Sequence, residues 1–443
     1  MKNLLILPFI LMSLVSASQI VFIPDTNFKN FLLADTIINT NKDGEIQITE
    51  ASSSPRMNIV CINKNIKSVE GIKAFTNLVS FYCRENQIDS IDIEGMVNLR
   101  TLAADRNNIS YIKLEKNLTD LGLRENKLTS IDISTLDSLR SFGISGNSIK
   151  ILDISKNKLL NGASATNCNL DSIKYCPSGY KNLVSFVVDS NNLTHIPINF
   201  NLWPIITNFI CSKNQIKSLH IPGSLAGFAT VVACADNQMT DLTFEDPGSI
   251  NRLVVSGNNI TTLQTDSMFD LVSFYSIGNP IKHLNLSNSK KLLVFYISSN
   301  ELETINIQND NNSSIIHFES ENSPSLYCIQ VDDTAYSKLN WRQVDSHTKF
   351  SPLCVIESDE TISINEPINQ HINLYPNPTS NQITLSGFYG QKKIRIINSL
   401  GETLFDQQVT SKEQLDISYL KPGLYSVLLG SNNELHSTIL VKQ

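Results

Sequence analysis

Residues 78–88 read LVSFYCRENQI, and the pattern in this stretch decides the fold. Apolar side chains stand at Leu78, Phe81, Cys83 and Ile88, and Asn86 precedes the last of them. The same frame recurs every 19 to 23 residues, and its asparagine position is occupied by Asn86, Asn107, Asn126, Asn147, Cys168, Asn191, Asn214, Asn237, Asn258, Asn279, Asn300 and Ser323. A regular period of this length is typical of stacked repeats, each too small to bury its apolar side alone. The sequence therefore predicts a solenoid.

Each frame predicts one short strand followed by a turn. Alternation points Phe81 and Cys83 inward and Tyr82 outward. The asparagine then turns the chain, and its amide can bond backbone groups that the turn leaves unpaired. A second alternating piece, such as residues 88–93, follows each turn and is too short for a helix. We therefore expect a β-rich solenoid whose second side consists of short strands or 3₁₀ turns.

Through this repeat, residues 57–325 resemble the leucine-rich-repeat family, and most closely its bacterial internalin-like type with short repeats. The resemblance implies a horseshoe whose parallel strands line a concave face, with short strands or 3₁₀ turns on the convex side. It implies a role in binding and specifies no particular chemistry.

The first residues predict export. Lys2 precedes an apolar run over residues 4–15, and Val15-Ser16-Ala17 offers small residues for cleavage. Residues 1–18 are therefore predicted to form a signal peptide. The apolar run is shorter than the about 20 residues that a membrane-spanning helix needs. No later stretch comes near that length, so we expect no transmembrane segment.

Residues 19–56 are predicted to cap the start of the solenoid. Asp25 is the expected N-cap of a short helix whose apolar stripe is formed by Phe28, Phe31 and Leu32. The following loop, residues 39–50, resembles an EF-hand calcium loop. Oxygen-bearing side chains occupy its first, third and fifth positions, a glycine its sixth and a glutamate its twelfth.

The candidate calcium ligands in this loop are Asn39, Asn41, Asp43, Glu45 and Glu50. Asparagine replaces the more usual aspartate at two of these positions, which lowers the ligand charge. Two hypotheses stay open. The loop binds one calcium ion weakly, or it is a polar turn of the cap and the protein needs no cofactor.

Residues 326–356 break the repeat and resemble the C-terminal cap of similar secreted bacterial repeat proteins. This resemblance predicts a disulfide between Cys328 and Cys354. Cys83, Cys211 and Cys234 stand at inward strand positions and are interpreted as small buried groups. A bridge between Cys211 and Cys234, which are in register on adjacent strands, remains an alternative.

The composition changes after residue 356. Residues 357–371 are acidic and without periodicity, which is typical of a linker. Residues 372–443 contain alternating runs between turn signals, and they predict a small β-sandwich.

This tail resembles the type A C-terminal sorting domain of the type IX secretion system, through its Tyr-Pro-Asn-Pro at 375–378, Asn398-Ser399-Leu400-Gly401, and Leu420, Gly423 and Tyr425. The resemblance implies recognition by that secretion machinery, passage across both membranes, and removal of the tail. Release into the medium and attachment to surface lipopolysaccharide both remain open.

No catalytic pattern accompanies the repeats. The seven histidines are scattered without ligand spacing, and the sequence contains no phosphate-binding loop or nucleophile elbow. Only 17% of residues are charged, the net charge is −7, and no basic block occurs. We therefore expect neither an enzyme nor a nucleic-acid-binding protein.

The outward residues of the concave strands are the candidate ligand-binding residues. In-register Tyr275 and Tyr296 would form a two-ring apolar platform that Ile277 extends, while the N-terminal strands offer Tyr82, Arg84 and Arg124. Tyrosine and arginine are enriched at binding hot spots. The leading hypothesis is an adhesin-like protein that binds a protein or a glycan. The alternatives are a structural envelope scaffold and an inhibitor or carrier of an exported enzyme, and the tyrosines would then serve only to pair neighbouring strands.

Overall fold

The computed structural model describes residues 19–196, 203–221, 230–244, 247–299, 301–354, 373–386, 391–398, 402–410, 413–431 and 434–443. The chain divides into two compact units, residues 1–355 and 356–443. The signal peptide predicted at 1–18 and the linker predicted at 357–371 lie outside the described residues. Within the described part, no helix has the length and apolar character needed to cross a bilayer.

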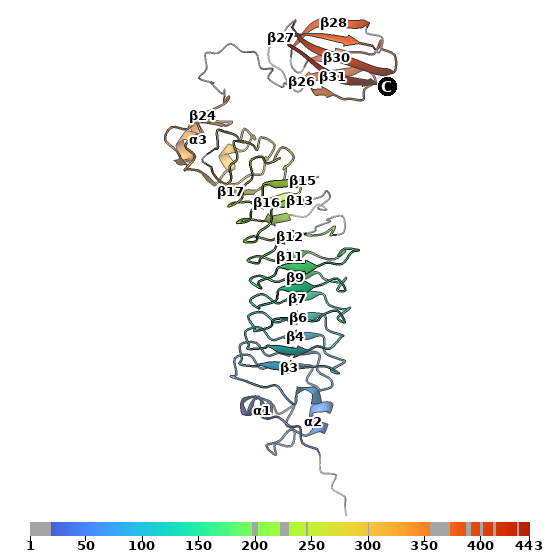
Figure 1. Ribbon diagram of the computed structural model, residues 1–443, viewed down its shortest axis with the longest axis vertical. Coiled ribbons are helices and arrows are strands. Elements are labelled where there is room, and N and C mark those ends of the chain that lie inside the picture. The colour runs from blue at the N-terminus through green and yellow to red at the C-terminus, as the bar shows by residue number, and fades with distance from the viewer. Residues whose placement is uncertain are drawn as a thin grey trace, which may run out of the picture. The chain divides into compact units, whose positions relative to one another are not determined.

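The first unit is a stack of short strands that forms one parallel sheet, as Figure 1 shows between α1 and α3. One strand comes from each repeat, as the repeating frame predicted. In sheet order the strands are β1 (Asn58–Val60), β2 (Ser80–Tyr82), β4 (Thr101–Ala103), β6 (Asp120–Gly122), β7 (Ser141–Gly143), β9 (Gly162–Ser164), β11 (Ser185–Val187), β12 (Asn208–Ile210), β14 (Thr230–Ala233), β16 (Ile250–Val254), β17 (Ser273–Ile277), β19 (Val294–Ser298), β21 (His317–Ser320) and β23 (Gln343–Val344).

The opposite wall of the solenoid consists of short strands and 3₁₀ turns, which confirms the expected convex side. Parallel pairing joins these strands in groups, namely β3 (Ser90–Asp92) with β5 (Tyr111–Lys113), β8 (Ile151–Asp153) with β10 (Ser172–Lys174), β13 (Ser218–Ile221) with β15 (Asp241–Phe244), and β18 (His283–Asn285), β20 (Thr304–Asn306), β22 (Cys328–Gln330) and β24 (Lys349–Ser351). The 3₁₀ turns include η1 (Ile72–Ala74) and η3 (Asn312–Ser314). One continuous apolar core fills the space between the two walls.

Buried asparagines tie each repeat to the one before it. The Asn126 amide group donates to the carbonyl oxygens of Ala104 and Leu123, both at 3.0 Å, and its Oδ1 accepts from the Ile109 amide at 3.0 Å. The same arrangement recurs at Asn107, Asn147, Asn214, Asn237 and Asn258. Because these backbone groups are buried, leaving one unpaired would cost about 1–3 kcal/mol.

Cys168 occupies one of these asparagine positions and supplies only part of the hydrogen bonding. Its thiol donates to the Ile144 carbonyl at 3.2 Å, but it carries no oxygen that could accept from the Ile149 amide. We expect Cys168→Asn to raise the free energy of unfolding by about 1 kcal/mol, as one hydrogen bond typically does. Urea denaturation measures the change. Asn126→Cys is the reciprocal control, and a lower stability of the Cys168→Asn variant would contradict this account.

Caps close both ends of the solenoid. At the start, α1 (Thr26–Leu33) is followed by α2 (Ile48–Ser53). The predicted N-cap is confirmed, because Asp25 accepts a hydrogen bond of 2.8 Å from the Phe28 amide. At the other end, α3 (Thr334–Asn340) leads to Trp341, whose ring stacks on Phe318 with 4.2 Å between centroids.

The C-terminal cap also holds a disulfide between Cys328 and Cys354, whose Cα atoms lie 5.7 Å apart. The other six cysteines are buried free thiols, including Cys211 and Cys234. Burial raises the pKa of Cys61 and of Cys234 to about 12, so neither is ionised near neutral pH. Cys61 and Cys234 therefore act as apolar groups of the core.

The second unit consists of antiparallel strands in two sheets around one core. One sheet contains β25 (Asn373–Tyr375), β26 (Gln382–Ser386) and β29 (Gln414–Asp416), and the other contains β28 (Thr403–Thr410), β27 (Gln391–Ile397), β30 (Gly423–Ser431) and β31 (Glu434–Lys442). Apolar side chains from both sheets share the core, as in a β-sandwich. Asn377 of the Tyr-Pro-Asn-Pro motif binds β31, because its side chain donates to the Ile439 carbonyl at 2.7 Å and accepts from the Val441 amide at 2.8 Å.

Candidate functional site

Strand register gathers the outward residues of the main sheet into one continuous row. Cα partners run from strand to strand through Tyr82, Ala103, Gly122, Gly143, Ser164, Val187, Ile210, Ala233, Val254, Tyr275, Tyr296 and Glu319. The alternation therefore assigned the outward residues of the concave face in their actual order. Tyrosines stand towards both ends of this row, and the residues between them are glycine, alanine, serine, valine and isoleucine.

An aromatic stack occupies the C-terminal part of the face. The rings of Tyr275 and Tyr296 are nearly parallel at 13°, with centroids 5.0 Å apart. His317 stacks on the far side of Tyr296 at 4.2 Å, and the Arg252 guanidinium lies 5.0 Å from the centre of the Tyr275 ring. We call Arg252, Tyr275, Tyr296 and His317 the tyrosine ladder.

The ladder differs from the predicted two-ring platform in the direction of its rings. Because Tyr275 and Tyr296 face each other along the sheet, a partner meets ring edges and hydroxyl groups in place of open ring faces. Ile277 lies beside them with 42% of its surface exposed. Arg252 and His317 stand two residues before the row positions of their strands, and sequence reasoning did not include them in the site.

The predicted N-terminal cluster surrounds a polar hollow of about 400 Å³. Arg84 and Asp105 form an ion pair at 3.0 Å between Nε and Oδ2, and the other Asp105 oxygen accepts from the Arg124 backbone amide at 2.8 Å. Tyr82 also lines the hollow, while Gly122 and Gly143 contribute no side chain. We call this feature the concave hollow.

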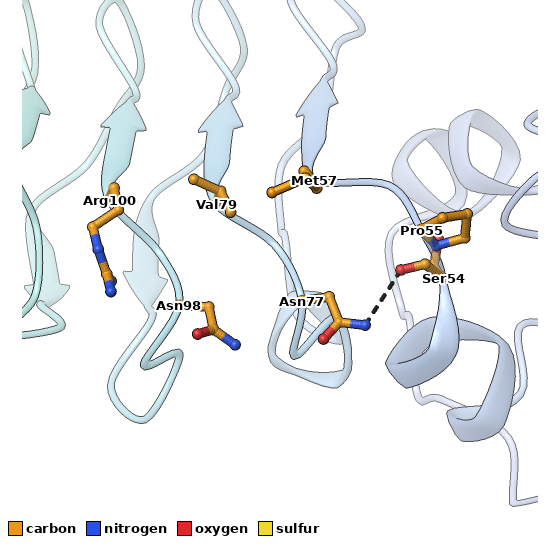
Figure 2. A pocket seen from close by; sticks show the side chains of 7 residues that line it. All are labelled: Ser54, Pro55, Met57, Asn77, Val79, Asn98 and Arg100. Carbon is orange, nitrogen blue, oxygen red and sulfur yellow. Dashed lines mark hydrogen bonds between the residues drawn. The ribbon is translucent and has the colours of Figure 1, made fainter.

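A second hollow, of about 530 Å³, lies where the N-terminal cap meets the first strands. Figure 2 shows Met57 and Val79 above Asn77 and Asn98, with Arg100 at one side and Pro55 at the other. Asn77 and Asn98 donate to backbone carbonyls of Ser52 and Thr76, at 2.9 and 3.0 Å. None of these residues was predicted as a site residue, because they precede the strands and stand outside the outward row.

The EF-hand-like loop is held together by its own hydrogen bonds. Glu50 Oε1 accepts from the amide and hydroxyl of Thr40 at 2.8 and 2.7 Å, while Asp43 Oδ2 accepts from the side-chain amides of Asn41 and Gln47 at 3.0 and 2.6 Å. Glu45 pairs with Lys29 at 2.6 Å, and Asn39 accepts from the Lys42 amide at 3.0 Å. Partial burial acts to raise the pKa of Glu50, but the hydrogen bonds outweigh it and the pKa is lowered. The loop therefore has the contacts of a stable polar turn, and calcium would compete with amide donors for Asp43.

One calcium titration separates the two hypotheses for this loop. If calcium binds, millimolar calcium raises the melting temperature, as expected for extracellular sites with dissociation constants of about 10⁻⁴ to 10⁻³ M. Glu50→Gln then abolishes the rise. A melting temperature that calcium leaves unchanged in the wild type supports the polar turn instead.

Ionisable side chains in the described segments do not form a candidate metal site. In those segments no group of three or more His, Cys, Asp or Glu residues is placed to hold a metal ion. The histidines stay dispersed, with His220 and His283 on the convex side bonded to Thr243 and Thr304.

Comparison with known proteins supports the assignment of the C-terminal unit and the fold of the solenoid. The family model described as "Secretion system C-terminal sorting domain" matches residues 373–443. No curated protein sequence matches the chain. Among solved structures, the functional domain of InlJ from Listeria monocytogenes, which includes a cysteine ladder, is 16% identical with a TM-score of 0.56, covering 94% of this chain and 98% of that one.

Two further structures are similar at lower scores. The internalin InlF from Listeria monocytogenes is 14% identical with a TM-score of 0.43, covering 70% of this chain and 98% of that one. YopM from Yersinia enterocolitica is 16% identical with a TM-score of 0.38, covering 62% of this chain and 79% of that one.

The chain is thus a leucine-rich-repeat solenoid with an internalin-like fold. More particularly, its C-terminal unit is a sorting domain of the type IX secretion system, as its sequence motifs predicted. The protein is therefore exported to the cell surface or the extracellular space.

Proposed function

We propose that this protein is an exported, adhesin-like binding protein whose concave face binds a partner. The tyrosine ladder is the observation that carries the proposal. Tyr275 and Tyr296 are only half-buried, although the inward positions beside them are filled by the fully buried Phe274 and Phe295. Because the inward residues already fill the core beneath this face, the two tyrosine side chains are available for contact with a partner. Aromatic residues of this kind dominate binding energy at interfaces.

Electrostatic features of the same face support recognition. Arg252 and His317 close the two ends of the ladder, and Glu319 lies 3.5 Å from His317. Such polar groups around an aromatic centre give a partner both apolar contact and orientation. The concave hollow adds a second patch of charge on the same row.

Binding of the exported chain to immobilised matrix proteins and to immobilised glycans tests this function. We expect saturable binding to members of one panel, and we expect the Tyr111→Ala variant to bind equally well. Tyr111 is 57% exposed on the convex strand β5, so it matches the ladder tyrosines in chemistry but not in location. Absence of binding to both panels would favour a scaffold role.

A further inference from the structure

Backbone conformation does not explain the two glycines of the concave hollow, and lack of space for a side chain does. Gly122 and Gly143 lie in strands β6 and β7 without a positive φ angle. Glycine in the interior of a strand weakens it, since it gains no packing and loses more entropy on folding. Two successive glycines in the row therefore call for another explanation.

Side chains from the preceding strands occupy the space above both glycines. A Cβ atom at Gly122 would lie 3.0 Å from Asp105 Oδ1, and one at Gly143 would lie 2.9 Å from Arg124 Nε. Any other residue would displace these groups. The glycines thus allow the Asp105 carboxylate and the Arg124 guanidinium to lie close to the backbone of the sheet.

The two arginines of the hollow differ in their partners. Arg84 is paired with Asp105, which also accepts from the Arg124 backbone amide, so the Asp105 charge is already compensated within the protein. Arg106, beyond the hollow, is paired with both Glu85 and Glu125. Among the residues that the structure describes, the Arg124 guanidinium has no ion-pair partner. Its donors therefore remain available at the side of the hollow.

We propose that the concave hollow anchors an acidic side chain of a partner protein, held by the Arg124 guanidinium. This inference rests on the proposed binding function and names the chemistry of one contact. A guanidinium presents two parallel donors that match the two oxygens of a carboxylate. Ser141, Thr101 and Asp120 line the same space, and a volume of about 400 Å³ accommodates a side chain and not a domain. The Asp120 carboxylate accepts a hydrogen bond of 2.7 Å from the Thr119 hydroxyl.

The tyrosine ladder favours a protein over a glycan as the source of this carboxylate. Sugar rings pack on open aromatic faces, and the faces of Tyr275 and Tyr296 are covered by each other, by Arg252 and by His317. The hollow at β6 and the ladder at β17 are also seven strand spacings apart in the sheet. At ~4.8 Å per spacing this is about 34 Å, a span that suits a folded protein.

The arginine Nε–H signals of the exported chain, labelled with ¹⁵N-arginine, report directly on the hollow. We expect the capped amino acid N-acetyl-glutamate N-methylamide to shift the Arg124 signal saturably, and the matching capped glutamine to leave it unchanged. Gly143→Ala should weaken this binding at least tenfold by displacing the guanidinium. Arg124→Gln should abolish the binding, and because this variant lacks the Arg124 signal, the binding is followed through the Arg84 signal. Gly162→Ala is the matched control, because a Cβ there meets no atom closer than 4.0 Å.

Two outcomes would overturn the proposal. Equal shifts with capped glutamate and capped glutamine would show that no carboxylate is recognised. Binding of methyl glucuronide or inorganic sulfate at least tenfold more tightly than capped glutamate would assign the hollow to an acidic sugar or a bare anion. Neither result concerns the tyrosine ladder. If the hollow binds no carboxylate but substitution of Tyr275 and Tyr296 still weakens partner binding, the proposed function stands.

Discussion

A chain that ends at residue 372 is expected to remain inside the cell that makes it. The sorting domain occupies residues 373–443, and its removal leaves the secretion machinery without its recognition element. The solenoid itself should fold normally, because its apolar core is separate from the core of the C-terminal unit. Immunoblots of cell and medium fractions would measure retention, which we expect to be nearly complete.

Two controls separate a sorting defect from a folding defect. Residues 19–356 alone should melt in one cooperative transition, which differential scanning calorimetry records. An unrelated periplasmic protein fused to residues 357–443 should be exported. Normal surface delivery of the chain that ends at residue 372 would refute the role of the tail.

Loss of the ladder tyrosines should abolish most of the partner affinity. We expect Tyr275→Ala combined with Tyr296→Ala to weaken binding at least tenfold, which is more than 1.4 kcal/mol. The stability of the solenoid should change little, because a cross-strand pair contributes about 0.2–1 kcal/mol. Surface plasmon resonance against a partner from the binding panels measures the affinity, and thermal denaturation the stability.

Substitution by phenylalanine refines this test. Tyr275→Phe with Tyr296→Phe keeps the stacked rings but removes the hydroxyl groups that face the partner. We expect an intermediate loss, because ring edges and hydroxyl groups together form the contact surface. If the double alanine variant binds every identified partner normally, Tyr82, Arg84 and Arg124 become the leading recognition residues.

The repeat period made the backbone of this protein predictable. A frame with a fixed asparagine sets which residue of each strand faces inward, so the register of Tyr82, Tyr275 and Tyr296 could be read from spacing alone. The sorting domain was equally predictable, because its motifs are local. The contacts of the EF-hand-like loop could not be predicted in this way, because the spacing of its residues does not specify their hydrogen-bond partners, such as Gln47.

Side-chain direction was beyond the reach of the sequence. The period places Tyr275 beside Tyr296 but does not choose between open and stacked rings. The structure shows stacked rings, with Arg252 and His317 on either side of the pair. In the same way, the row showed glycines at 122 and 143 as small residues. Only the structure shows that the Asp105 and Arg124 side chains occupy the space above them.

Hydroxyl-radical footprinting of the exported chain with and without its partner tests the central claim most directly. Tyrosine oxidation reports on side-chain exposure, and the chain offers tyrosines on both faces. We predict that the partner slows oxidation of Tyr275 and Tyr296 on the concave face and leaves Tyr111 on the convex strand β5 unchanged. Protection of Tyr111 with unchanged oxidation of Tyr275 and Tyr296 would contradict recognition by the concave face.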